Sequence, residues 1–383
     1  MAFTKFGELQ PEQITNWNRV LWKNARNKSW LNTVLGTSAN SVVQHVKELT
    51  VNGKGARAAI TLVPDGENDG VAGDRNLEGR ESALTSVAQY ITIDQLAAAH
   101  INKGVMDDQR TIVNFRVQAR DALEYWLSDR IDQLAFLTLA GIDYKYRPDG
   151  SERPIGDPDV VTELHLLDFA QDVSPPTERR RIRWAKNTAD SDGALVVGGV
   201  SGDVVATDTI TWNMIVRLKA WAHSNYIKPV RGPNGEDLYH LYVPPFVLAD
   251  LKLDPAYMQA VTHAAQRGDK NKLFSGGILP VDGIYVHEHR WAPSTIRAPA
   301  GSKYGSTGNI DGAQLLFCGA QALAFADLDS VNWCEKKFDY DRRKGISAGR
   351  IIGFKKPLFP NRYTNGQSED HGVVSVYVAT KGA

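Results

Sequence analysis

An acidic, glycine-rich stretch holds the residues whose types and spacing come nearest to a metal site. Four of them follow the pattern that opens a calcium-binding loop, namely Asp65, Glu67, Asp69 and Gly70. In such a loop, carboxylate oxygens at alternate positions face the ion and the glycine permits a sharp turn. The twelfth position holds Asn76 instead of a bidentate glutamate, and strand-like sequence flanks the stretch where helices are required. We therefore interpret it as a solvated or partner-facing acidic loop, with calcium binding as the alternative.

Two histidines and two glycine-rich stretches are further candidates for chemistry. His287 and His289 would point to the same side of a strand, but zinc needs a third ligand and none stands at a telling spacing. Hydrogen-bonded strand histidines are the preferred interpretation. The stretches GKGARA at 53–58 and GGVSGD at 198–203 lack a complete phosphate-loop pattern, so we predict turns at both.

Other catalytic signatures are missing from the sequence. It contains no HExxH arrangement and no GxSxG nucleophile elbow, and Cys318 and Cys334 have neither metal-type spacing nor a catalytic context. We therefore predict no enzymatic activity, no cofactor and no bound metal. A metal-dependent enzyme that uses His287 and His289 is the alternative.

Charge is concentrated in three segments. Residues 65–81 contain six carboxylates, namely Asp65, Glu67, Asp69, Asp74, Glu78 and Glu81. Residues 178–186 (ERRRIRWAK) contain five basic groups, among them Arg179, Arg180, Arg181 and Arg183. Residues 336–356 contain eight, among them Arg342, Arg343, Lys344 and Arg350. Basic segments of this kind can contact phosphates or an acidic protein surface, and simple solvated faces are the alternative.

Composition is that of an ordinary folded protein, with 42% hydrophobic and 23% charged residues. The 44 basic and 44 acidic residues cancel, so net charge indicates neither a nucleic-acid nor a membrane partner, and complementarity between copies is the favoured interpretation. The presence of only two cysteines favours a reducing site of assembly. Neither a secretion signal nor a run of about eighteen apolar residues occurs, so we predict no spanning helix.

The longest regular pattern runs from Asp107 to Gly141. Apolar residues recur three and four positions apart from Ile112 to Leu137, which predicts one helix with an apolar stripe. The opposite face carries charged residues, namely Arg110, Arg116, Arg120, Asp121, Glu124, Asp129 and Asp132. At 1.5 Å per residue this helix would be about 50 Å long, which suggests a spine on which the chain is built.

Two segments before this helix have too little apolar surface to fold alone. Residues 1–48 hold short helical patterns with Trp17, Trp22 and Trp30, and we expect an arm that lies on a neighbour. A helix packed on the chain's own core is the alternative. Residues 49–97 place strand-like sequence on both sides of the acidic loop, which predicts an extended hairpin stabilised by another surface.

The remainder of the chain is predicted to be mixed. Proline density breaks residues 142–205, where strands are expected at Val160–Leu167 and Arg179–Lys186. A helix is expected over Thr209–Ser224, capped by Asp208 or Thr209. Further strands are predicted at Leu238–Val243, Gly283–His289, Ala313–Cys318, Ala322–Ala326, Glu335–Tyr340, Gly349–Phe354 and Val373–Ala379, and short helices at Phe246–Leu251 and Ala256–Ala265.

Several stretches carry a resemblance to a known family. They are GTSANSVVQ at 36–44, TLVPDGENDGVAGDRNLEG at 61–79, ITIDQL at 91–96, VNFRVQARDALEYWLSDRIDQLAFLTLAG at 113–141, LYVPPFVLADLKLDP at 241–255, LFSGGILPVDGIYVHEHRW at 273–291 and GVVSVYVA at 372–379. In wording and in element order the chain resembles the major capsid proteins of tailed bacteriophages with the Hong Kong 97 fold, in a podovirus-type branch. The resemblance covers most of the chain and is weakest over 142–205.

The resemblance implies an α+β fold with five parts. Residues 1–48 would be the N-terminal arm, 49–97 the E-loop and 98–205 the P-domain, with its spine helix at 107–141. Residues 206–330 would be the A-domain, and 331–383 the strands that return to the P-domain.

The resemblance also implies a structural function in the virion. Copies would assemble in the host cytoplasm as hexamers and pentamers into an icosahedral head around double-stranded DNA; an encapsulin-like shell around protein cargo is the alternative. The family often carries an N-terminal scaffolding segment for which this chain has no room, so a separate scaffolding protein is expected. A portal protein, packaged DNA bound without sequence preference and, in some members, a decoration protein are the further implied partners, and no membrane is implied.

Contacts between subunits are expected to join the acidic loop to Arg342, Arg343, Lys344 and Arg350, and to involve the three arm tryptophans. A weaker expectation places Arg179, Arg180, Arg181 and Arg183 against the DNA.

Overall fold

The computed structural model describes residues 29–47, 57–63, 70–81, 86–105, 115–157, 161–187, 193–233, 235–264, 282–360 and 366–382. The helices among these residues are α2 (Leu31–Val34), α4 (Phe115–Ala140), α5 (Trp212–Ser224), α6 (Pro245–Lys252) and α7 (Pro255–Ala264), with the 3-10 turns η1 (Leu164–Leu166), η2 (Asp168–Asp172), η3 (Glu178–Arg180) and η4 (Ser201–Asp203). No helix in these ranges combines the length and the apolar character needed to cross a membrane.

The strands lie in four sheets. They are β1 (Leu35–Gly36), β2 (Val43–Val46), β3 (Arg57–Leu62), β4 (Val87–Thr92), β5 (Asp94–Ile101), β6 (Arg181–Ala185), β7 (Ala194–Val197), β8 (Val230–Arg231), β9 (Asp237–Val243), β10 (Ile284–Glu288), β11 (Gly312–Cys318), β12 (Leu323–Phe338), β13 (Arg343–Lys355), β14 (Leu358–Pro360), β15 (Ser368–Asp370) and β16 (Val373–Ala379). The larger sheets have the orders β1-β2-β12-β13-β5 and β10-β9-β11-β16-β6-β7, with β8 added to β9.

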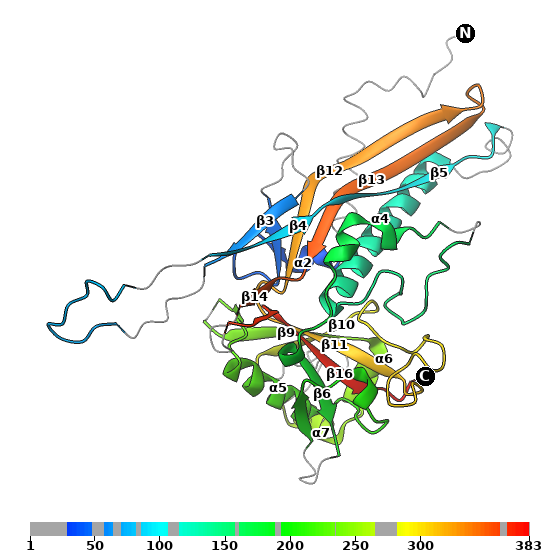
Figure 1. The fold of residues 1–383 in the computed structure, drawn as a ribbon. Coiled ribbons are helices and arrows are strands. Elements are labelled where there is room, and N and C mark those ends of the chain that lie inside the picture. The colour runs from blue at the N-terminus through cyan, green and yellow to red at the C-terminus, as the bar shows by residue number, and fades with distance from the viewer. Residues whose placement is uncertain are drawn as a thin grey trace.

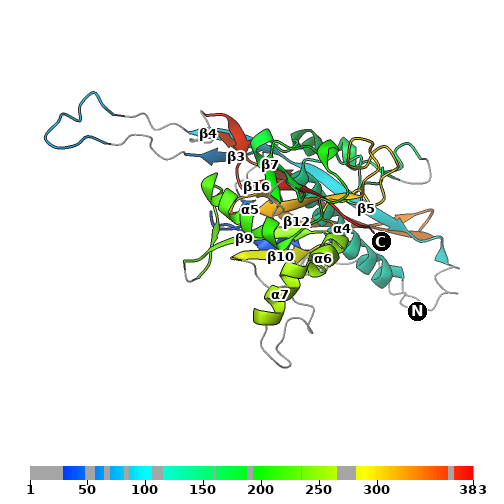
Figure 2. The same ribbon diagram turned by 90° about the horizontal axis from the view of Figure 1, so that it is seen from below.

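The molecule has a long part and a more compact part. In Figure 1, β12, β13 and β5 run beside α4 in the long part, and the seven-stranded sheet with α5, α6 and α7 forms the compact part. The hairpin of β3 and β4 extends away from the long part. Residues 70–81, between these two strands in the sequence, lie far from the long part and from the compact part (Figures 1 and 2).

The seven-stranded sheet separates two hydrophobic cores. Side chains alternate along β11, so Leu316 and Cys318 join the core around α4 while Leu315 and Phe317 join the core beneath α5 and α6. Because both faces of this strand are buried, its sequence is a continuous apolar run apart from Gln314.

Helix α4 confirms the predicted spine over the residues that the structure describes. It ends at Gly141, whose φ of +69° and contact with the Ser174 carbonyl leave no room for a side chain. Its last ten residues, from Ile131 to Ala140, are all buried. The predicted solvated face is therefore wrong at Asp132, which is buried against the segment that precedes α2.

Three predicted strands differ from the structure. The described part of Val160–Leu167 is not a strand: it contains η1, and η2 follows it and places Phe169 in the core. The Asp168 N–H donates to Asp94 Oδ2 at 3.0 Å, and such bonds between side chain and backbone compete with strand pairing. Predicted separate strands at Ala322–Ala326 and Glu335–Tyr340 are one strand, β12, bent by an irregularity in its pairing between Asp327 and Val331.

The other predicted elements are confirmed to within a few residues, and β16 matches its prediction at both ends. Helix α5 begins at Trp212, and its cap is Thr211 instead of Asp208 or Thr209, since Thr211 Oγ1 accepts from the Met214 N–H at 3.3 Å. Gly198 lies in a turn after β7, as predicted, whereas residues 53–56 of the other glycine-rich stretch lie outside the described residues.

The expected domain boundaries do not follow the sheets. Strands β6, β7 and β16 lie outside residues 206–330 but pair into the same sheet as β9, β10 and β11. Strand β12 runs through residue 330 without a break in the element. The reason is that the parallel pairing of β16 with β6 joins segments almost 200 positions apart, which local sequence does not reveal.

Candidate assembly surfaces

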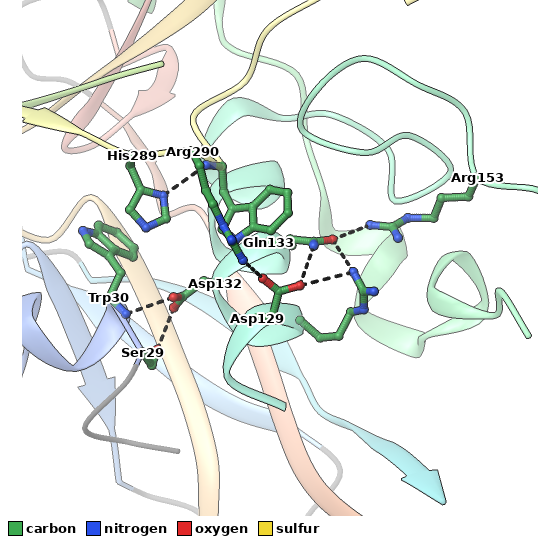
Figure 3. Close-up of polar contacts among 10 residues, drawn as sticks. Ser29, Trp30, Asp129, Asp132, Gln133, Arg153, His289 and Arg290 are labelled. Atoms are coloured by element: carbon green, nitrogen blue, oxygen red, sulfur yellow. Dashed lines mark hydrogen bonds and ion pairs between the residues drawn. The ribbon is translucent and has the colours of Figure 1, made fainter. Parts of the chain in front are cut away.

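The root of the N-terminal segment is held by one buried carboxylate on α4. Asp132 Oδ1 accepts from Ser29 Oγ at 2.6 Å and from the Leu31 N–H at 3.3 Å, and Oδ2 accepts from the Trp30 N–H at 2.9 Å (Figure 3). Burial raises the pKa of Asp132, although these three bonds favour the carboxylate. Asp132 therefore fixes the segment from Ser29 to Leu31 on α4.

Trp30 packs inside its own chain. Its ring lies 4.5 Å from that of Phe136, 4.9 Å from that of Tyr242 and 5.8 Å from that of His289. These neighbours come from α4, β9 and the segment after β10, so Trp30 joins the arm, the spine and the compact part. Most of Trp30 is therefore buried in its own chain, as the packed alternative predicts, and a contact of its exposed part with a neighbouring subunit stays a prediction. Trp17 and Trp22 lie outside the described residues.

A second polar group on α4 faces the segment after β10 and the loop after α4. Asp129 Oδ1 lies 2.6 Å from Arg290 Nη2, and its Oδ2 accepts from Gln133 Nε2 at 2.9 Å. Gln133 Oε1 in turn accepts from Arg153 Nη2 at 3.1 Å and from Arg130 Nη1 at 2.8 Å. Figure 3 shows these groups converging on one turn of the helix.

The described part of the acidic loop is exposed. Asp74 and Glu78 lie in turns between β3 and β4, Glu81 follows them, and all three are open to solvent. Asp65, Glu67 and Asp69 lie outside the described residues, so the calcium-like half of the loop does too. In both views residues 70–81 and the tip of the β12–β13 hairpin lie at opposite ends of the molecule. Contact between them therefore requires a second copy of the chain.

The tip of the β12–β13 hairpin carries exposed basic residues on a strained turn. Asp339, Tyr340 and Asp341 have φ values of 51°, 50° and 68°, a left-handed conformation that non-glycine residues rarely adopt. Tyr340 is fully exposed. Arg342, Arg343 and Lys344 follow, are exposed, and form the basic hairpin surface.

Like charges face one another across this hairpin. Lys344 lies directly opposite Lys337 in the strand register, and the Lys337 ammonium is 2.8 Å from Asp341. Two lysines directly opposite each other in an antiparallel pair repel, so an acidic partner that binds the tip would stabilise it.

Arg350 does not belong to the basic hairpin surface. It is 3% exposed, lies over the Phe325 ring at 5.3 Å and forms an ion pair with Asp327. Asp327 also lies 2.8 Å from His45 of β2, at the bend of β12. The predicted role of Arg350 at a subunit contact is therefore wrong. Arg350 lies on the part of β13 that is inside the fold, where its side chain is buried and paired with Asp327.

Residues 179–183 are used within the chain. Arg180 Nη2 lies 3.1 Å from Glu369, and Arg183 Nη2 lies 3.0 Å from Asp208. Arg181 donates to the Gly198 carbonyl at 3.2 Å. Arg179 is the most exposed of the four and lies 3.7 Å from Glu369. The predicted contact with DNA is therefore wrong at Arg180, which is buried, and it stays a prediction at Arg179, Arg181 and Arg183.

His287 and His289 are packed in the fold and do not converge. His287 Nε2 lies 2.9 Å from His240 Nδ1, while His289 stacks on Phe136 at 4.5 Å. The pKa of His289 is lowered to about 4, mainly by burial and to a smaller extent by repulsion from Arg290. Within the described residues, no three His, Cys, Asp or Glu side chains are arranged to hold a metal ion.

Sequence reasoning missed the residues that hold the parts together. The prediction assigned Asp132 to a charged helix face and did not single out Gln133. It counted Lys356 in the basic segment 336–356, whereas Lys356 is buried and lies 3.1 Å from the buried Asp370. One available signal was a charged residue between long apolar neighbours, such as Asp132 between Ile131 and Leu134.

Comparison with known proteins supplies the context for these surfaces. The family model described as phage capsid protein matches residues 5–381. The "Major capsid protein" of Pseudomonas phage KPP25 is 47% identical over 377 residues, which cover 98% of each chain.

Solved structures show the same fold at lower identity. The capsid of Ralstonia phage GP4 superposes with a TM-score of 0.71 at 24% identity, covering 92% of this chain and 91% of that one. The capsid asymmetric unit of cyanophage Pam1 gives 0.70 at 20%, with 93% of each chain covered, and the capsid of Helicobacter pylori bacteriophage KHP30 gives 0.62 at 14%, with 92% of each covered.

Proposed function

Since the chain belongs to the phage capsid protein family, we propose that it is a major capsid protein whose copies assemble into the icosahedral head of a tailed phage around double-stranded DNA. Its mixed helix-and-sheet fold is of the Hong Kong 97 type. The observation that carries the proposal is the 47% identity to a major capsid protein over nearly the whole of both chains.

Electron microscopy of the expressed protein tests this function. Hollow shells of uniform size are expected, alone or together with a scaffolding protein. A monodisperse monomer that forms no particle under either condition contradicts the proposal. Particles that enclose protein and no nucleic acid when purified from phage-producing cells would instead support the cargo shell, which the relatives reported above do not favour.

The parts of the chain suggest how copies join. We assign residues 1–48 to an N-terminal arm, the β3–β4 hairpin with its loop to an E-loop, the spine with β12 and β13 to a P-domain, and the compact part to an A-domain. Buried apolar surface contributes about 25 cal/mol per Å², so segments with little core of their own gain stability when a neighbour covers them. Trp17 and Trp22 remain proposed contacts of the arm.

The acidic loop is proposed to lie over the basic hairpin surface of a neighbouring copy. Its described members Asp74, Glu78 and Glu81 are exposed, as are Arg342, Arg343 and Lys344. A single exposed ion pair stabilises by about 0–1 kcal/mol, but three pairs repeated at every contact of a lattice add up. Screening at high salt weakens such contacts, so assembly should be sensitive to ionic strength.

Charge reversal tests this contact directly. Replacing Arg342, Arg343 and Lys344 together by glutamate should prevent shell formation while the subunit keeps its unfolding temperature, because all three side chains are exposed. A second reversal, with lysine at Asp74, Glu78 and Glu81, restores attraction and should restore shells. Normal assembly of the first variant, or no rescue in the double reversal, contradicts the docking.

Other partners are proposed from the family alone. A separate scaffolding protein, a portal protein and packaged DNA fit a capsid subunit, and a decoration protein is a further candidate. We also infer a purely structural role without catalysis, for which measured hydrolytic or metal-dependent activity of the purified protein would be contrary evidence.

A further inference from the structure

Three arginines meet where the loop after α4 folds back onto the spine. Arg130 lies on α4, and Arg147 and Arg153 lie on the two sides of a tight hairpin between Lys145 and Arg153. The Arg147 N–H donates to the Ser151 carbonyl at 2.8 Å, and the Arg153 N–H to the Lys145 carbonyl at 2.8 Å. The turn is formed by the sequence RPDG at 147–150, in which proline stands at the second position and glycine at the fourth, where each is favoured.

The turn depends on its glycine and sets the direction of the arginines. Gly150 has a φ of +83° and packs against the Ser294 carbonyl, so a side chain there would be both strained and crowded. Tyr146 pairs with Glu152 across the hairpin. Because side chains alternate along each strand, Arg147 and Arg153 lie on the same side, opposite to that of the Tyr146–Glu152 pair.

Two of the guanidiniums share a single acceptor. Arg130 Nη1 and Arg153 Nη2 donate to the same oxygen, Gln133 Oε1, at 2.8 and 3.1 Å. Arg153 Nε donates to the Tyr144 carbonyl at 2.9 Å. Figure 3 shows Arg153 reaching Gln133 from the loop side. The direct partners of Arg153, which is only 7% exposed, are therefore neutral oxygens, and they do not neutralise its charge.

Few negative groups offset this charge. Asp129, the carboxylate beside Arg130 at 3.7 Å, also lies 2.6 Å from Arg290. Within the described ranges, neither Arg147 nor Arg153 has a carboxylate at ion-pair distance. Burial lowers the pKa of Arg153 to about 10, repulsion by Arg130 and Arg147 acts in the same direction, and attraction by Asp149 and Asp129 opposes it only in part.

We propose that Arg130, Arg147 and Arg153 form a binding site for a phosphate group. A tetrahedral phosphate accepts hydrogen bonds from several directions, whereas a planar carboxylate is filled by one or two guanidinium forks. Arg290 and Arg297, whose side chains are 70% and 76% exposed, lie beside the site, although each is already paired with a carboxylate, Arg290 with Asp129 at 2.6 Å and Arg297 with Asp149 at 3.5 Å. Five arginines against these two aspartates leave an excess of positive charge where a phosphate approaches. The phosphate group comes from free phosphate or from the backbone of a nucleic acid, and the binding chemistry is the same for both.

Titration calorimetry on purified, unassembled subunits tests the site. Sodium phosphate is titrated at constant ionic strength into the wild-type protein, Arg147→Gln, Arg147→Lys and the control Arg217→Gln, which removes one exposed positive charge on α5, away from both basic surfaces. Losing one charge-assisted hydrogen-bond donor weakens binding about tenfold, so Arg147→Gln should raise the Kd by that factor. Arg147→Lys should weaken binding less, and Arg217→Gln should leave it unchanged.

A DNA oligonucleotide, titrated in parallel, distinguishes the two sources. Oligonucleotide binding that Arg147→Gln weakens and free phosphate displaces supports a backbone phosphate, while phosphate binding without oligonucleotide binding supports the free ion. Phosphate heats equal to those of chloride overturn the site, as does the same Kd in all four proteins. Tighter binding of free glutamate than of phosphate also overturns it and indicates a carboxylate partner. If Arg147→Gln does not fold, Arg147→Lys against wild type decides.

Discussion

Replacing Asp132 by alanine should release the root of the N-terminal arm from the spine. The substitution removes the acceptor for Ser29 Oγ and for the N–H groups of Trp30 and Leu31. Asp132 is 6% exposed and Leu31 2%, so water does not readily replace the lost partner. The donors would remain unsatisfied or the segment would detach.

The size of the effect follows from these bonds. A buried donor without a partner costs about 1–3 kcal/mol, so two buried backbone donors and a hydroxyl give about 3–5 kcal/mol for local opening. An opening that is easier by 3 kcal/mol raises local hydrogen exchange by about 100-fold. Replacing Asp132 by asparagine keeps one acceptor oxygen and removes a buried charge, so it should cost less.

The stability of the wild type should depend on pH through Asp132, and that of Asp132→Asn should not. Because the pKa of Asp132 is raised by burial, the folded chain binds a proton there more readily than the unfolded chain does. This contribution to stability therefore falls as pH rises from the ordinary aspartate pKa through the raised value. Asp132→Asn should lack that dependence.

Hydrogen exchange followed by mass spectrometry measures the release. Peptides covering residues 29–46 should exchange faster in Asp132→Ala than in wild type, while peptides from β11 and β16 should not change. Asp121→Ala is the matched control, since this carboxylate on the same helix is 41% exposed and pairs with the adjacent Arg120. Equal protection of residues 29–35 in Asp132→Ala and Asp121→Ala would refute the anchoring role.

The remaining predictions concern buried charges, a histidine pair and the hairpin tip. Lys356→Met should lower the free energy of unfolding by about 3–5 kcal/mol in denaturant titrations, because Asp370 stays buried without its lysine partner. Adding Asp370→Asn should recover most of this loss, and an equal loss in the single and the double variant would contradict the prediction. Burial, and then His287, lowers the pKa of His240 to about 4, so stability should be lost as pH falls from about 6.5 to 4 by up to about 1.4 kcal/mol per pH unit, and His240→Gln should flatten that slope. Tyr340→Ser should leave the unfolding temperature unchanged, since the ring is fully exposed, and should lower the yield of shells; an altered unfolding temperature would show that the tip is part of the fold.

Local patterns predicted most elements because their causes are local. The helix over Trp212–Ser224 follows from apolar spacing, and β16 follows from a valine-rich segment, VVSVYVA, that begins directly after Gly372. Gly141 ends α4 because only glycine fits its left-handed conformation beside Ser174. Segments whose structure depends on distant partners were missed, and η1 and η2 are the clearest case.

The candidate surfaces were predicted only in part, because charge in a sequence does not report burial. Of the basic residues named between 336 and 356, Arg342 to Lys344 are exposed whereas Arg350 and Lys356 are buried and paired. The difference arises where β13 leaves the hairpin tip and enters the sheet beside β5 and β12. A strand of thirteen residues crosses from solvent to core, and its composition does not mark the crossing.

The sequence alone determined the class of protein, the spine helix and the existence of exposed acidic and basic segments, because composition, periodicity and motif wording express them directly. Only the tertiary structure decided that Asp132 holds the segment from Ser29 to Leu31, that Trp30 packs inward and that Arg130 and Arg153 share Gln133. These contacts join residues tens to more than a hundred positions apart. Their energies depend on distance and burial, which exist only once the chain has folded.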